Sequence, residues 1–154
     1  MLRSPTNLLA FGFGTGLARV APGTFGTLPA LILWIPLSKL PWLAYLAVVV
    51  VMLVAGIRIC QQASDALGVH DHGGIVWDEI VGYLITMFLV PFSLPAMVLG
   101  FLLFRAFDII KPWPISWVDK KVSGGLGIML DDVLAGIASC LVLHLIIKLG
   151  SGSF

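Results

Sequence analysis

Two adjacent pairs of carboxylates are the residues of this chain whose types and spacing best suggest chemistry. Asp78 and Glu79 precede one apolar run, Asp131 and Asp132 precede another, and Asp108 follows a third. Clustered carboxylates supply the hard oxygen ligands that Mg²⁺ prefers when it also binds a substrate phosphate. We therefore expect the two pairs to be metal ligands and catalytic groups, with Asp108 as a fifth catalytic candidate.

A simpler interpretation is that each pair only stabilises a helix. Both pairs are predicted to lie in the first turn of a helix, where an acidic side chain contributes about 0.3–1 kcal/mol by interacting with the helix dipole. That explains one acid per helix better than it explains two adjacent pairs in so small a protein. The pattern favours a functional cluster, but it leaves open which carboxylate would act as the general base.

Three cationic residues are candidates for binding a phosphate group. Arg105 and Asp108 have the i,i+3 spacing that places both on one helical face. Lys111 precedes Pro112, which disfavours helix there, so Lys111 is predicted near a helix C-terminus; dipole pairing is its alternative role. Lys120 is expected to contact anionic lipid headgroups or to be merely solvated.

Further candidates for the phosphate side lie in loops. His70, Asp71 and His72 form a short polar run before the first acid pair, and histidines there could donate a proton or a hydrogen bond. Thr24 is predicted to cap the following helix. The Gly-rich stretches 12–16 and 124–129 could present backbone N–H groups to phosphate or could allow close helix packing.

The composition indicates an integral membrane protein. Hydrophobic residues make up 59% of the chain and charged residues 11%, against roughly 25% charged residues in soluble domains. The mean hydropathy is +1.06. The net charge of +1 does not suggest binding to nucleic acid. Cys60 and Cys140 belong to no redox or metal motif.

The apolar runs predict an all-α fold, because no run alternates with the period of two that strands require. We expect one domain over residues 1–154, a polytopic membrane bundle of about five or six embedded helices, some short or re-entrant. A full crossing needs about 20 residues, and several runs are shorter. The runs cover residues 28–37, 42–60, 80–90, 96–107 and 133–149.

The cations predict which face is cytoplasmic. If each run crosses or re-enters, segments 1–27, 61–79 and 108–132 share one face, and the turns 36–41 and 91–95 share the other. Of the nine Lys and Arg residues, seven fall on the first face, which the positive-inside rule makes cytoplasmic. The seven are Arg3, Arg19, Arg58, Arg105, Lys111, Lys120 and Lys121; the others are Lys39 and Lys148. All the acids fall on the same face, so no charge needs to cross the bilayer.

Four motifs together resemble the phosphatidylglycerophosphatase A family of bacterial inner-membrane lipid phosphatases. They are GFGTGLARVAPGTFGTL, GVHDHGGIVWDEIVG, FRAFDIIKPWPISW and GGLGIMLDDVLAG, in this order along nearly the whole chain. The resemblance implies dephosphorylation of phosphatidylglycerophosphate to phosphatidylglycerol, with Mg²⁺ required.

The sequence lacks the motifs that other phosphatase mechanisms require. Cys60 is not followed by the Arg of C-x5-R, and no D-x-D occurs. What remains is attack by a metal-activated water. Two alternatives from other classes stay open: a CDP-alcohol phosphotransferase, whose acids would be four residues apart, and a cation transporter, whose acids would be spread through the membrane depth.

Overall fold

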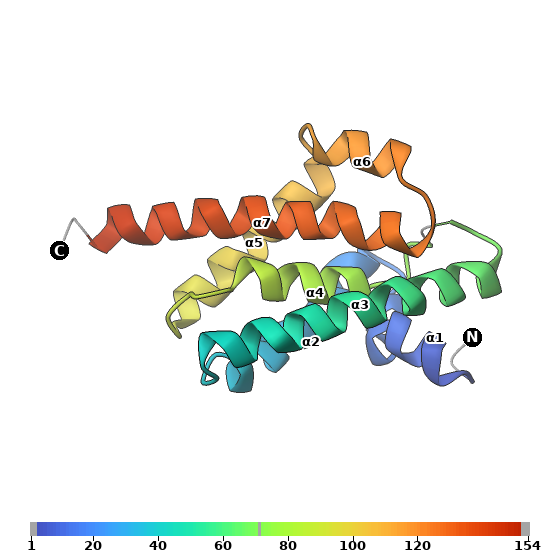
Figure 1. Cartoon of the computed structure of the whole chain (residues 1–154), viewed down its shortest axis with the longest axis horizontal. Helices are drawn as coiled ribbons and strands as arrows, with labels where there is room; N and C mark the ends of the chain where they lie inside the picture. The colour runs from blue at the N-terminus through green and yellow to red at the C-terminus, as the bar shows by residue number, and fades with distance from the viewer. Residues whose placement is uncertain (1–2, 71, 152–154) are drawn as a thin grey trace.

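The computed structural model describes residues 3–70 and 72–151, and these residues form helices and connections without a strand (Figure 1). The all-α prediction is thus confirmed. The helices, in chain order, are α1 (Pro5–Ala10), the 3-10 helix η1 (Gly12–Leu17), α2 (Pro22–Leu37), α3 (Trp42–Leu67), α4 (Trp77–Thr86), α5 (Leu94–Ile110), α6 (Ile115–Lys121) and α7 (Gly124–Ser151).

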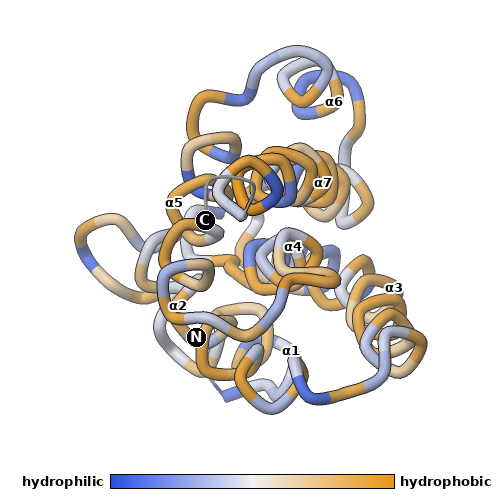
Figure 2. The backbone as a smooth tube through the Cα atoms, turned by 90° about the vertical axis from the view of Figure 1, so that its left-hand side faces the viewer, coloured by the Kyte–Doolittle hydropathy of each residue, from blue (hydrophilic) through white to orange (hydrophobic). Residues whose placement is uncertain are grey.

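The short helix α4 lies at the centre of an elongated bundle. It packs against α2, α3, α5 and α7, and α7 also packs against α3, α5 and α6. Figure 2, which looks along the bundle, shows α4 beside α7, with α3 and α5 on opposite sides. Most of α4 is buried, including Val81, Tyr83 and Leu84. A helix of 10 residues cannot cross a bilayer, but it can fill the interior of a bundle.

Small residues let α4 approach α7 closely. A Cβ added at Gly136 would lie 2.5 Å from the carbonyl oxygen of Gly82, and one added at Gly82 would lie 2.9 Å from the carbonyl oxygen of Asp132. Side chains larger than hydrogen would therefore push the helices apart, as at other small-residue contacts between membrane helices. This packing brings the N-terminal part of α4 beside the middle of α7.

Two helices are long and apolar enough to cross a membrane, α3 with 26 residues and α7 with 28. Only 22% of the apolar window of each is buried within the protein, whereas the core helix of a soluble protein is mostly covered. The helices α2 and α5 are shorter, with 16 and 17 residues. The bundle of five or six embedded helices stays a prediction beyond these two spans.

The connections alternate between the two ends of the bundle (Figure 1). The α3–α4 and α5–α6–α7 connections lie at the end where α2 begins, and the α2–α3 and α4–α5 turns lie at the other. The polar segments 61–79 and 108–132 therefore share one end, which we call the polar end, as the sequence indicated. Helix α6 was not among the predicted elements.

Two sequence-based placements are wrong. Asp131 and Asp132 do not lie in the first turn of a helix, because α7 already begins at Gly124. The glycines from Gly124, by contrast, follow the packing alternative that the sequence allowed: they are helical, and an added Cβ at Gly125 would clash with the backbone of α3 at Ile57. Thr24 caps no helix, since α2 begins at Pro22 and its N-cap residue is Ala21.

Candidate active site

The acidic residues converge in one pocket at the polar end of the bundle. The pocket has a volume of about 240 Å³ and lies where the first turn of α4, the last turn of α5 and the third turn of α7 meet. Its lining residues are Gly73, Ile75, Asp78, Glu79, Asp108, Ile109, Lys111, Asp131 and Asp132. All five carboxylates proposed from the sequence are thus in its wall, and we call this site the acidic pocket.

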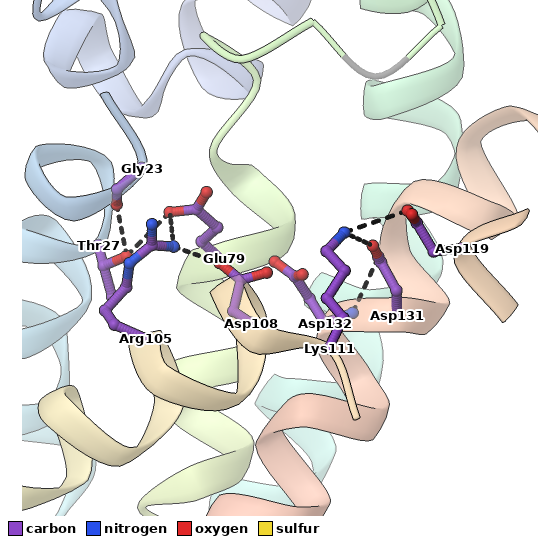
Figure 3. A network of polar contacts seen from close by, with 9 residues as sticks. All are labelled: Gly23, Thr27, Glu79, Arg105, Asp108, Lys111, Asp119, Asp131 and Asp132. Atoms are coloured by element: carbon purple, nitrogen blue, oxygen red, sulfur yellow. Dashed lines mark hydrogen bonds and ion pairs between the residues drawn. The ribbon is translucent and has the colours of Figure 1, made fainter. Parts of the chain in front are cut away.

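Asp132 is at the centre of the acidic pocket. Its carboxylate belongs to two groups whose oxygens lie within 4.8 Å of one another, one with Asp78 and Asp131 and the other with Glu79 and Asp108. Its side chain lies between those of Asp108 and Lys111 (Figure 3). Asp132 is 2% exposed, and its Oδ2 accepts no hydrogen bond from any residue that the structure describes. A buried oxygen without a donor is costly unless a ligand binds it.

Lys111 provides a positive charge on the wall of the pocket. Its backbone adopts the left-handed conformation (φ 50°) that ends α5, so that Nζ lies 2.9 Å from Asp131 Oδ2 and 3.1 Å from Asp119 Oδ1 (Figure 3). Partial burial lowers the pKa of Lys111, but the hydrogen bonds and attraction of Asp131 and Asp119 outweigh this and raise the pKa above its ordinary value. The ammonium therefore stays protonated at neutral pH.

Arg105 does not line the acidic pocket but supports it from behind. Its guanidinium forms ion pairs with Glu79, at 3.2 Å, and with Asp108 (Figure 3). Thr27 Oγ1 lies 3.0 Å from Glu79 Oε2, and a Cβ on Gly23 would lie only 2.7 Å from the guanidinium. These contacts suit a residue that positions Glu79 and Asp108. The sequence-based assignment of Arg105 to the substrate stays a prediction.

The other phosphate-side candidates lie outside the lining of the acidic pocket. His70 is exposed in a separate depression beside Asp65. His72 Nδ1 accepts a hydrogen bond from the Gly74 N–H at 3.0 Å. Lys120 is exposed on α6, and Thr24 is half-buried in the first turn of α2. Asp71 lies outside the described residues. Their proposed roles stay predictions.

Sequence reasoning missed Thr27 and Asp119, which each contact a charged residue of the site. Thr27 is four residues after Gly23, on the same face of α2, and its hydroxyl lies 2.7 Å from the Gly23 carbonyl oxygen. Once a helix is assigned from residue 22, this spacing indicates that Thr27, rather than Thr24, faces the bundle. Asp119 carries no such signal, because its contact with Lys111 depends on the unpredicted helix α6.

Comparison with known proteins identifies the family. Residues 8–147 match the sequence profile of Phosphatidylglycerophosphatase A. This chain belongs to the phosphatidylglycerophosphatase A family. The family match confirms the resemblance seen in the four motifs.

Individual relatives cover almost the same length. The chain is similar to Phosphatidylglycerophosphatase A of Escherichia coli (strain K12), with 44% identity over 94% of this chain and 85% of that protein. The protein of the same name from Haemophilus influenzae is 46% identical, over 94% of this chain and 90% of its own length. A Bacteroides thetaiotaomicron relative, provisionally named phosphatidylinositol-3-phosphatase, is 39% identical over 88% of this chain and 89% of its own length. No solved structure matches the chain.

Proposed function

We propose that this phosphatase removes the phosphate from phosphatidylglycerophosphate, giving phosphatidylglycerol, and that it does so in the acidic pocket with bound Mg²⁺. Membership of the phosphatidylglycerophosphatase A family carries the assignment of the reaction. The convergence of five carboxylates from three helices carries the assignment of the site. The proposed residues are Asp78, Glu79, Asp108, Asp131 and Asp132.

The donor set of the pocket fits Mg²⁺. Its potential ligands are carboxylate oxygens, which this cation prefers to nitrogen or sulfur. The buried Asp132 Oδ2, without a hydrogen-bond donor among the described residues, is the kind of atom that a cation would satisfy. Asp132 forms one candidate ligand group with Asp78 and Asp131 and another with Glu79 and Asp108. Bound Mg²⁺ would supply Lewis-acid activation of the phosphate and acidify a water molecule.

Lys111 provides the positive charge that would bind the phosphate of the substrate. Lys111 stays protonated and lines the pocket, so its ammonium would attract the oxygens of a phosphate bound there. The surrounding carboxylates would otherwise repel a phosphate dianion. Arg105 holds Glu79 and Asp108 in place and neutralises part of their charge. The general base is one of the pocket carboxylates.

The two rival functions fit the site less well. A cation transporter would have carboxylates along a path through the membrane, whereas the acidic-pocket carboxylates gather at the polar end of the bundle. A CDP-alcohol phosphotransferase would need acids four residues apart, and the pairs here are adjacent.

We also propose that the enzyme is a multi-pass protein of the bacterial inner membrane with the acidic pocket facing the cytoplasm. The seven-to-two distribution of cations between the two ends supports this orientation. In a chain without Cys60 and Cys140, a cysteine at Gly73 should react with an impermeant maleimide only from the cytoplasmic side, and one at Ser93 only from the opposite side. Reaction of both from one side would contradict this topology.

Phosphate release by the purified protein tests the reaction. With phosphatidylglycerophosphate and Mg²⁺ we expect inorganic phosphate, loss of activity in EDTA, and recovery with Mg²⁺ but poor recovery with Ca²⁺, which favours looser coordination. Phosphatidylinositol-3-phosphate, suggested by the provisional name of the Bacteroides relative, is the comparison substrate. Preference for that lipid would contradict the proposed substrate. Full activity after removal of the metal would contradict the proposed requirement for Mg²⁺.

A further inference from the structure

The corner between α5 and α6 exposes large apolar side chains at the polar end of the bundle. Ile109 is 66% exposed, Ile110 74%, Trp113 79% and Trp117 53%. Exposed apolar side chains gathered in one region are uncommon on a water-facing surface and mark contact with a partner or a membrane. Lys120 and Lys121 follow in the last turn of α6, and both are exposed.

The length of α7 indicates how deep this corner lies in the membrane. The part of α7 from Val133 to Ser151 is about 28 Å long at 1.5 Å per residue, close to the thickness of about 30 Å of a bilayer's hydrocarbon core. Asp131 therefore lies near the edge of the hydrocarbon when α7 spans it. The hydrogen bond of 2.9 Å between Lys111 Nζ and Asp131 Oδ2 holds the corner at the same level.

The order of residues along α6 matches the order of layers at a membrane surface. From the corner, α6 runs beside α7 toward the residues where α7 begins (Figure 1). Ile109, Ile110 and Trp113 are thus deepest, and Lys120 and Lys121 are nearest the water. Aromatic residues favour the boundary between hydrocarbon and headgroups, and lysines just outside it attract anionic headgroups.

We propose that residues 109–121, which we call the interfacial corner, are a docking surface for an anionic lipid headgroup layer. Ile109 and Lys111 belong to both the interfacial corner and the wall of the acidic pocket. The pocket then opens at the depth of lipid phosphates, and a lipid substrate enters sideways from the membrane surface beside α6. The entry of substrate depends on the proposed function, whereas the membrane contact does not.

Depth-dependent fluorescence quenching tests the membrane contact without any activity measurement. Single-tryptophan variants that retain Trp113 or Trp117 are reconstituted in vesicles containing phosphatidylglycerol. Lipids brominated near the headgroup end of the acyl chain should reduce the emission about twofold, more than lipids brominated near the methyl end, and aqueous acrylamide should quench weakly. A variant retaining Trp34, which is fully buried, is the control that neither quencher reaches.

Strong quenching of Trp113 and Trp117 by acrylamide, with no effect of the brominated lipids, would overturn the proposal. If a single-tryptophan variant does not fold, 5-fluorotryptophan in the unmutated chain gives the same comparison by NMR with lipid-bound and aqueous paramagnetic agents. The double variant Trp113→Ser/Trp117→Ser should raise the apparent KM for vesicle substrate about fivefold or more, with kcat unchanged. If the quenching result holds but phosphatidylglycerophosphate is not hydrolysed, the proposed function fails and the docking surface stands.

Discussion

The acid pair of α4 and the acid pair of α7 meet in one pocket, but the fold treats their charges differently. Glu79 in the first turn of α4 is ion-paired with Arg105 at 3.2 Å and contacts the hydroxyl of Thr27. The N-terminus of α4 also favours negative charge. Asp131 and Asp132 lie inside α7, beyond its first turn, where the dipole contributes little.

Burial separates Glu79 from the α7 pair, although Asp78 of the α4 pair is also buried, at 6% exposed. Asp131 and Asp132 are 4% and 2% exposed, and the Oδ2 of Asp132 accepts no hydrogen bond from the described part of the chain. Burying carboxylates close together destabilises a fold unless a partner compensates them. The comparison indicates that the Glu79 side of the pocket is held by the protein itself, whereas the Asp132 side is arranged for a ligand.

The largest expected effect is that of Asp132→Asn. If Asp132 binds Mg²⁺, loss of its charge should reduce phosphate release by on the order of 10²-fold or more, about 2.7 kcal/mol in the barrier. The melting temperature in detergent without Mg²⁺ should be equal to or above that of the wild type, because the variant relieves repulsion among buried carboxylates. Asp78→Asn and Asp131→Asn should show the same loss of turnover.

Asp65→Asn is the matched control for these variants. Asp65 is exposed near the end of α3 and lines no part of the acidic pocket, so its amide variant should keep nearly full turnover. Near-wild-type activity in Asp132→Asn would mean that the α7 pair is structural. A large fall in its melting temperature would show that the pair stabilises the fold.

Glu79→Gln should differ from Asp132→Asn in stability. The substitution removes the ion pair with Arg105 and leaves the guanidinium, 14% exposed, beside a neutral partner. We expect turnover to fall and the melting temperature to fall slightly as well, because Arg105 loses one of its two carboxylate partners and keeps Asp108. A second change, Arg105→Gln, should lower the melting temperature further, because it leaves Asp108 without its ion pair; equal melting temperatures for the single and double variants would show that this ion pair does not stabilise the fold.

A smaller effect is expected from the hydroxyl of Thr27. Thr27→Val keeps the shape of the side chain but removes the contact of 3.0 Å with Glu79. Turnover should fall by roughly tenfold or less, in keeping with about 1 kcal/mol for one hydrogen bond. Thr24→Val, one turn earlier in α2, should have less effect. A stronger effect at Thr24 would restore the sequence-based assignment of Thr24 to the substrate.

The sequence was sufficient to predict the five carboxylates that line the acidic pocket. The alternation of apolar runs and turns indicated that the regions around Asp78, Asp108 and Asp131 share one end of the bundle. Pro112 fixed the end of the helix that carries Asp108, since the residue before proline disfavours helix. These signals are local, and local signals determine where helices end and which end of a hairpin a residue occupies.

Contacts between helices could not be predicted in the same way. For the glycines from Gly124 the sequence left phosphate binding and close helix packing open, because the packing partner on α3 is set only by the fold. The sequence also does not show that the helical face of Arg105 turns toward Glu79, and the assignment of Arg105 to the substrate stays a prediction. Both outcomes depend on long-range packing, which apolar periodicity does not encode.

Direct binding of Mg²⁺ tests the central claim that the two acid pairs form one metal site. Mg²⁺ is titrated into wild-type protein and Asp132→Asn in detergent, and the melting temperature is followed without substrate. A ligand that binds only the folded state raises its stability with concentration, so the wild-type melting temperature should rise and saturate while that of Asp132→Asn stays nearly constant. Equal responses of the two proteins, or no response of the wild type, would contradict the metal site.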